Sequence, residues 1–108
     1  MDRHRIAEER SLAYHRAIAA RLQAEPALVE RARARVQTWL SSGESTRFYA
    51  REWARILAGS LGDVADAMCD ANERGRELRQ STPFAGALSA RERWRIWRDI
   101  GERLAGGT

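Results

Sequence analysis

The chain has 108 residues and a formal net charge of +4. This is the length of a single domain, and no apolar run approaches the roughly 20 residues that span a bilayer. No secretory leader is recognisable at the start of the chain. We therefore expect one domain over residues 1–108, with frayed ends at 1–4 and 105–108, located in the cytoplasm.

All 19 basic side chains are arginine, and the chain contains a single cysteine, Cys69. Guanidinium groups suit buried ion pairs, carboxylate-rich partners and phosphates better than ammonium groups do. A GC-rich genome would produce the same bias, so the arginines alone do not identify a partner. One cysteine excludes an intrachain disulfide and a cysteine-based zinc site. We expect Cys69 to be a buried, inert thiol.

Breaks at Pro26, Gly43, Gly59 and the segment 83–86 divide the chain into five helical segments. No stretch alternates with a period of two, and β-branched residues are scarce, so strands are not expected. We predict an all-α fold, a compact bundle of four to five helices.

Two amphipathic helices are expected in the first 43 residues. The first covers about residues 3–23, and its shallow apolar stripe contains Leu12, His15, Ile18, Ala19 and Leu22. The second begins at Pro26, and Ser41, Ser42 and Gly43 end it. Its apolar face consists of Leu28, Val29, Ala32, Val36, Trp39 and Leu40.

A third helix is predicted over residues 46–58, with Tyr49, Trp53, Ile56 and Leu57 on its apolar face. Arg47, Arg51 and Arg55 recur one turn apart on another side. Together with the preceding helix they could form a helix-turn-helix that enters a DNA major groove. Trp39 weakens this reading, because it occupies a position where a small residue usually packs between the two helices.

A capping box of Ser60 and Asp63 opens a fourth predicted helix, which continues to about Leu78. Five carboxylates share a sector on the face opposite the apolar one: Asp63, Asp66, Asp70, Glu73 and Glu77. This acidic row either neutralises the arginines of the third helix within the fold or remains exposed. An exposed row would dock on a basic protein surface or mimic the charge of nucleic acid.

A second capping box, Ser89 and Glu92, opens the last predicted helix at about Ala90. Trp94 and Trp97 fall on its apolar side, while Arg91, Arg95 and Arg98 fall on the other. Arg93 lies inside the apolar sector, where a guanidinium requires an acidic or carbonyl partner. With Phe84 from the preceding turn, Arg93, Trp94 and Trp97 have the composition of an interface hot spot. Core packing of both tryptophans is the competing interpretation.

Groups for catalysis are scarce. The chain has no lysine and two histidines, His4 near the terminus and His15 on an apolar stripe. No glycine-rich loop follows a strand, and the acidic row lacks the Glu-x-x-His pattern of helical di-iron sites. We therefore predict no enzymatic activity, no catalytic residues, no metal and no cofactor.

The segment 81–97, together with Glu52-Trp53 and the segment 10–16, resembles the short helical antitoxins of bacterial two-gene toxin–antitoxin modules, in particular those paired with nucleotidyltransferase-type toxins. The resemblance extends over most of the chain, but it lies in the overall residue pattern and includes no signature motif. It implies a non-enzymatic protein that binds and silences a cognate toxin and in some cases represses its own operon.

The sequence thus favours a protein-interaction module that neutralises a cognate toxin. The partner-binding candidates are Asp63, Asp66, Asp70, Glu73, Glu77, Phe84, Arg93, Trp94 and Trp97. One alternative is a small DNA-binding regulator that uses Arg47, Arg51 and Arg55. A second is a homo-oligomeric helical protein, for example a homodimer. Nucleic acid is thus the second choice of partner, and no membrane association is expected.

Overall fold

The computed structural model describes residues 2–43 and 47–106, except for the side chains of Arg47 and Phe48. The described residues form helices and connecting turns, with no strand, which confirms the all-α prediction. The helices number six instead of four to five. They are α1 (Arg3–Ala19), α2 (Ala27–Ser42), α3 (Arg47–Leu57), α4 (Leu61–Met68), α5 (Glu73–Gln80) and α6 (Ala90–Gly106).

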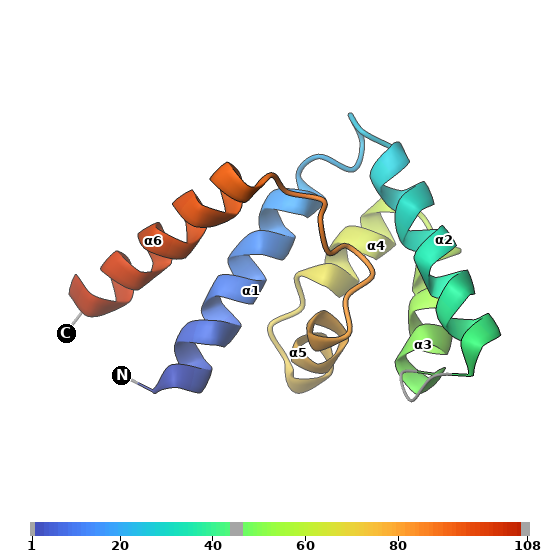
Figure 1. The fold of residues 1–108 in the computed structure, drawn as a ribbon, viewed down its shortest axis with the longest axis horizontal. Coiled ribbons are helices and arrows are strands. Elements are labelled where there is room, and N and C mark those ends of the chain that lie inside the picture. Colours follow the sequence, from blue (N-terminus) through green and yellow to red (C-terminus); the bar gives the residue numbers. More distant parts are fainter. Residues whose placement is uncertain (1, 44–46, 107–108) are drawn as a thin grey trace.

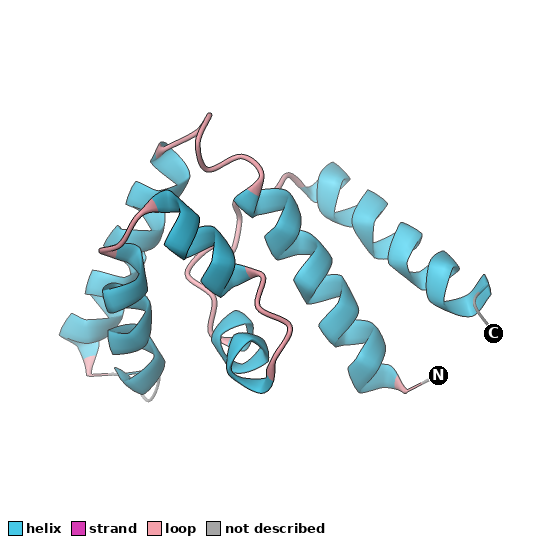
Figure 2. Ribbon diagram, turned by 180° about the vertical axis from the view of Figure 1, so that it is seen from behind, coloured by secondary structure: helices cyan, strands magenta, loops and turns pink. Residues whose placement is uncertain are grey.

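The helices are arranged in three groups along the long axis of the molecule (Figure 1). α2 and α3 run antiparallel at one end, α1 and α6 lie side by side at the other, and α4 and α5 lie between them; the view from behind shows the same grouping (Figure 2). The Cα radius of gyration is 14.2 Å, somewhat above the ~13 Å expected for a globule of this length. The fold is therefore elongated, with α6 at one edge.

The hydrophobic core centres on Trp53 of α3, which is fully buried and donates its indole N–H to the Leu78 carbonyl oxygen at 3.1 Å. The predicted apolar faces of α2 and α3 are confirmed: four of the named residues of α2 and two of α3 are buried, and the others pack partly buried against the core. In α1 the stripe is also buried around Leu12, His15 and Ile18. α1 ends at Ala19 and a turn follows, so it is shorter than the predicted helix.

The fourth predicted helix is two helices. α4 ends at Met68 and α5 begins at Glu73, with the break at residues 69–72. In Figure 1 the two helices point in different directions, α5 being seen nearly end-on. The acidic row was predicted on the assumption of one continuous helix, so the prediction that its five carboxylates share one helix face is wrong. Asp63 and Asp66 belong to α4, Asp70 to the connection, and Glu73 and Glu77 to α5.

Three side-chain and backbone features produce this break. The Asn72 side chain accepts a hydrogen bond from the Gly75 N–H at 2.8 Å and caps α5. Gly75 packs against the Asp70 carbonyl so closely that a Cβ at this position would lie 2.0 Å from the oxygen. Arg79 is buried and donates to the carbonyl oxygens of Met68 and Asp70 at 3.1 and 2.6 Å. The guanidinium from α5 thus satisfies carbonyls that the end of α4 leaves open.

α6 begins with the predicted capping box in full. The Ser89 hydroxyl accepts from the Glu92 N–H, and the Glu92 carboxylate accepts from the Ser89 N–H, both at 3.1 Å. The helix then packs along α1, and Ile100 is its one fully buried residue within the described range. Glu92 also forms an ion pair with Arg21, just beyond α1. An edge helix with so little buried surface leaves most of its side chains in solvent.

The two ends of the chain are partly ordered. Arg3 and His4 form the first turn of α1, where the Asp2 side chain accepts from the His4 N–H at 3.0 Å and caps the helix. Ala105 and Gly106 belong to the last turn of α6. Positions 1, 107 and 108 lie outside the described residues.

Candidate interaction surface

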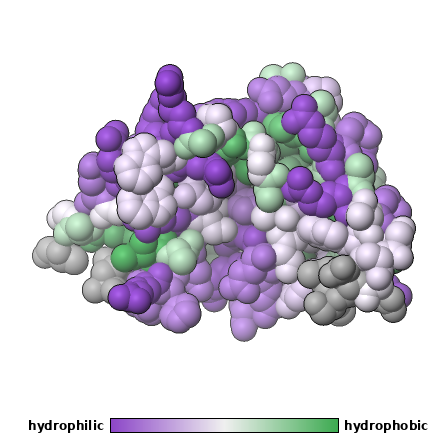
Figure 3. Space-filling model, in the orientation of Figure 1, coloured by the Kyte–Doolittle hydropathy of each residue, from purple (hydrophilic) through white to green (hydrophobic). Residues whose placement is uncertain are grey.

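Trp94 and Trp97 lie on the surface of α6, with 58% and 42% of their area exposed. Their rings stack with centroids 5.1 Å apart and an angle of 12° between the planes. The core interpretation, which turned both tryptophans inward, is wrong, because α6 is covered only on the side that meets α1. The face in Figure 3 is largely hydrophilic, with hydrophobic residues in small patches. Leu61 is the one other large hydrophobic residue exposed among the described residues, so an exposed tryptophan pair is unusual there.

Arg10 of α1 fixes the position of Trp97. Its guanidinium carbon lies 3.8 Å from the Trp97 ring centroid, and its Nε donates to the Trp97 carbonyl oxygen at 3.0 Å. The same guanidinium approaches α6 at Gly101, where a Cβ would lie 2.7 Å from an Arg10 nitrogen. Glycine at this position allows Arg10 to reach over the helix. Arg10 thus both holds α6 on α1 and orients one of the exposed rings.

A shallow hollow of about 230 Å³ lies beside the stacked rings. Its wall consists of Tyr14 from α1 and Ala90, Arg93, Trp94 and Trp97 from α6. Sequence reasoning placed Arg93 on an apolar face in need of an acidic or carbonyl partner within reach. Arg93 is instead exposed at the rim of this hollow, in contact with solvent. Arg93, Trp94, Trp97, Tyr14 and Ala90 are called the tryptophan site below.

Sequence reasoning missed Arg10, Tyr14 and Ala90 as members of this site. Arg10 and Tyr14 are one turn apart on α1 and outside its apolar stripe, so their spacing carried a weak signal. What the spacing could not show is that α6 packs beside them. Ala90 carried no signal of its own, because it is an ordinary first residue of a helix.

Arg93 and Arg10 supply positive charge at the tryptophan site. Arg91, Arg95 and Arg98 are exposed on α6, as predicted, and Arg10 lies across Trp97. Glu92, an acidic residue in the first turn of α6, forms an ion pair with Arg21. The surface therefore combines aromatic area with several cationic groups in solvent, which is the composition of interface hot spots.

Phe84 does not belong to this surface. It is buried in the core, where its ring meets Trp53 edge to face at a centroid distance of 5.9 Å. The prediction of Phe84 as a partner-binding residue is wrong. The segment between α5 and α6 folds back into the core, and Arg35 holds it by donating to the carbonyl oxygens of Pro83 and Ala85 at 3.2 and 2.8 Å.

The five carboxylates of the acidic row are all exposed, but they do not form one face. Glu77 accepts a hydrogen bond from the Tyr49 hydroxyl at 3.3 Å, and Asp70 accepts from the Asn72 N–H at 3.2 Å. Tyr49, Glu73 and Glu77 line a second hollow of about 400 Å³ with Glu52, Arg74 and Leu78. Glu77 and Asp70 thus make local hydrogen bonds, and the five carboxylates do not come together at one site.

The arginines proposed for DNA binding are only partly available. Arg55 pairs with Glu52 of its own helix, and Arg74 from α5 pairs with the same carboxylate. These two guanidiniums lower the pKa of Glu52. Arg51 is exposed, whereas the side chain of Arg47 lies outside the described part of the structure. No ion pair between the described α3 arginines and the acidic row is seen; the carboxylate that pairs with Arg55 and Arg74 is Glu52, which belonged to neither predicted row.

Two titratable groups, His15 and Cys69, lie away from the tryptophan site. His15 Nδ1 donates to the Ser11 carbonyl oxygen at 2.7 Å, and its Nε2 accepts from the Thr82 hydroxyl at 2.8 Å. Burial lowers the pKa of His15, the hydrogen bond to Ser11 opposes this, and the charge of Arg79 adds to it. His15 is therefore a neutral core histidine. Cys69 is half-buried, and burial raises the pKa of its thiol.

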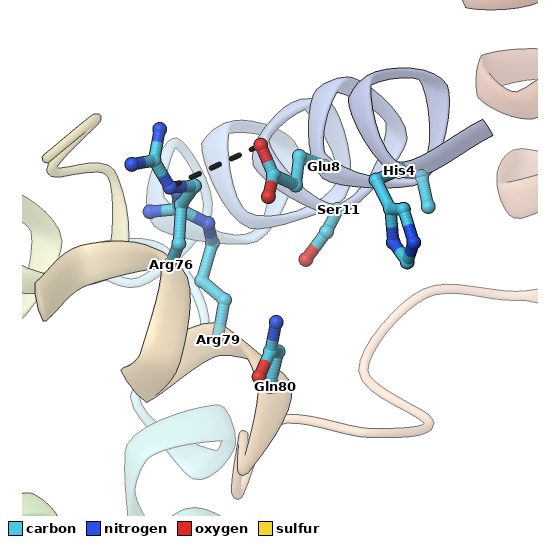
Figure 4. A pocket seen from close by; sticks show the side chains of 7 residues that line it. His4, Glu8, Ser11, Arg76, Arg79 and Gln80 are labelled. Atoms are coloured by element: carbon cyan, nitrogen blue, oxygen red, sulfur yellow. Dashed lines mark ion pairs between the residues drawn. The ribbon is translucent and has the colours of Figure 1, made fainter. Parts of the chain in front are cut away.

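A polar hollow of about 120 Å³ separates α1 from α5 (Figure 4). His4, Glu8 and Ser11 line it from α1, and Arg76, Arg79 and Gln80 from α5. Arg76 faces Glu8 across it at 3.9 Å, and Arg79 donates to α4 carbonyls. Its cationic groups are thus already engaged within the fold.

Among the described residues, no cluster of three or more His, Cys, Asp or Glu side chains could hold a metal ion. None of the helices in the described ranges has the length and apolar character needed to cross a bilayer. Comparisons with protein-family models, with curated proteins and with solved structures give no match. The fold and the surface together define an all-α helical protein with an exposed aromatic and cationic face.

Proposed function

We propose that this protein is a non-enzymatic interaction module that binds and neutralises a cognate toxin protein, with the tryptophan site as its interface. The observation that carries the proposal is the exposed stack of Trp94 on Trp97. Tryptophan and arginine are the residue types most enriched in protein-binding hot spots, and a folded protein rarely leaves two stacked indoles in water without a partner. The toxin partnership itself follows from the resemblance of the chain to short antitoxins.

The geometry of Trp97 favours a protein partner over nucleic acid. The Arg10 guanidinium and the Trp94 ring both lie close to the Trp97 ring. Both contacts reduce the open area of the Trp97 ring. Single-stranded nucleic acids bind through bases that stack on open aromatic faces, so Trp97 is a less favourable platform for a base. Ring edges and a flanking hollow fit side chains of a protein.

Two alternatives have less support. α2 and α3 run antiparallel and side by side, whereas the helices of a helix-turn-helix cross at about 90–120°. Arg55 is also engaged by Glu52. If the protein is a DNA-binding regulator, its affinity for duplex DNA must fall steeply as the salt concentration rises, and the Arg51→Glu variant must lose this binding. For the homo-oligomer, light scattering must show a molar mass that rises with protein concentration.

Co-expression with the adjacent open reading frame tests the proposal. We expect the neighbouring product to inhibit growth alone, to be harmless with this protein, and to co-purify with it. The double variant Trp94→Ala, Trp97→Ala should lose both protection and co-purification. Leu61→Ala is the matched control, since Leu61 is an exposed apolar residue (38%) on α4, away from the tryptophan site. A harmless neighbour that does not co-purify would exclude the antitoxin role.

A further inference from the structure

The hollow beside the tryptophan stack has a size and lining that identify its occupant. At about 230 Å³ it is below the ~300–1,000 Å³ range of small-molecule pockets. Its walls are aromatic on two sides, from Tyr14 and the tryptophans, and Ala90 forms part of the lining without filling it. A space of this kind accepts one large apolar side chain.

The charge at the rim adds a second requirement. Arg93 lines the hollow and is exposed, and its side chain forms no hydrogen bond or ion pair within the described part of the structure. A guanidinium in this position binds a carboxylate in a bidentate, charge-assisted pair. Arg10 lies across the Trp97 ring and adds positive charge beside the site, and the whole chain carries +4. An acidic segment is therefore attracted to this surface, and a basic one is repelled.

We infer that the tryptophan site binds a protein segment in which Asp or Glu stands beside one large apolar residue. The apolar side chain enters the hollow against Tyr14 and Trp94, and the carboxylate pairs with Arg93. This inference rests on the proposed function, because it describes how the same surface recognises its partner. It also reverses the charge of the partner expected from the sequence, since the acidic row would have required a basic surface.

Selection from a random peptide display library on the immobilised full chain tests this inference without knowledge of the toxin. We expect enrichment of peptides that contain an acidic residue next to a large apolar one. Changing that acid to its amide in a selected peptide should weaken binding by about tenfold, because a charge-assisted pair is lost. Selected peptides without an acidic residue, or no enrichment at all, would overturn the inference.

Two pairs of variants locate the binding. Ala90→Leu fills the hollow from an exposed helix position and should weaken binding of the selected peptide by about tenfold or more. Ala34→Leu, an equally exposed position on α2, is its control. Arg93→Glu should abolish binding of the selected peptide. Arg95→Glu is its control, because it changes the net charge equally at a position about 200° around the helix from Arg93. This control should preserve most of the binding. Equal effects within either pair would contradict the assignment.

The same preparation distinguishes the other classes of ligand. Oligo-deoxythymidine and anionic phospholipid vesicles are titrated while the tryptophan fluorescence is recorded. We expect neither to change the emission in a way that depends on Arg93. An Arg93-dependent response to either would assign the site to nucleic acid or to a membrane surface instead. A failure of toxin co-purification with successful peptide selection would remove the proposed function and leave this recognition site standing.

Discussion

Arg10 and Trp97 contact one another twice across the α1–α6 boundary. The guanidinium carbon of Arg10 lies 3.8 Å from the centre of the Trp97 ring, and its Nε donates to the Trp97 carbonyl oxygen at 3.0 Å. One side chain thus attaches α6 to the body of the protein and sets the orientation of an exposed indole. Ile100 is the one buried residue of α6 in the described range, so this attachment adds to a limited buried contact between the two helices.

Replacing Arg10 by glutamine should loosen α6 without unfolding the protein. The cation–π contact and the hydrogen bond are each worth about 0.5–1.5 kcal/mol, so local opening of α6 should become roughly tenfold more frequent. Hydrogen exchange of the α6 amides measures this directly. Arg5→Gln is the control, since Arg5 is an exposed residue of the same helix. Equal exchange in the two variants would show that Arg10 does not hold α6.

Two glycine substitutions test the break between α4 and α5. Gly75→Ala should destabilise the protein by about 2 kcal/mol or more, because the new methyl group meets the Asp70 carbonyl oxygen at 2.0 Å. Gly62→Ala in α4 meets nothing closer than 3.7 Å and should stabilise by up to ~1 kcal/mol through helix propensity. Urea unfolding measures both. A continuous helix from 61 to 80 would be stabilised by alanine at both positions.

Arg79 should be the most important charged residue for stability. Arg79→Met removes the donor to two carbonyl oxygens at the end of α4. Leaving buried acceptors unsatisfied costs about 1–3 kcal/mol each, so we expect a loss of at least ~2 kcal/mol in urea unfolding. Arg76→Met, which removes only the exposed 3.9 Å pair with Glu8, should cost less than ~1 kcal/mol. Similar losses in the two variants would contradict this role of Arg79.

Stability should fall as the solution is acidified below about pH 6.5, the ordinary histidine pKa. Burial lowers the pKa of His15 in the folded protein, so the unfolded chain takes up a proton first as the pH decreases. The free energy of unfolding is therefore retained above pH 6.5 and lost between pH 6.5 and the lowered pKa. Urea titrations at several pH values measure the slope. His15→Gln should flatten it; an unchanged slope would assign the dependence to other groups.

The helices that show a clear apolar periodicity or a capping box in the sequence were predictable. α2 and α3 have complete apolar faces and clear ends, and the box at Ser89 and Glu92 forms as its spacing indicates. The break between α4 and α5 was not predictable from periodicity, because the apolar residues Val64, Met68 and Leu78 keep a helical spacing across it. The causes of the break are tertiary: the Gly75 backbone packs on Asp70, and Arg79 reaches back to α4.

The tryptophan site shows a second limit of pattern reading. Helical phasing placed Trp94 and Trp97 on the apolar side of α6, but it could not reveal how much of that side is covered. α6 lies at the edge of the fold and packs along α1, so Ile100 is buried whereas both tryptophans are exposed. The prediction for Phe84 was wrong in the opposite sense: it was expected at the surface but is buried, because the turn before α6 folds into the core beside Trp53.

The most direct test of the central claim is the affinity of the co-purified partner for Trp94→Ala, measured by isothermal titration calorimetry beside the unmodified protein. Trp94 is more than half exposed, so its loss should leave the thermal midpoint nearly unchanged. If the tryptophan site is the interface, Kd should rise by about tenfold or more. An unchanged Kd in a variant that remains folded, or a chain that binds no partner at all, would contradict the account.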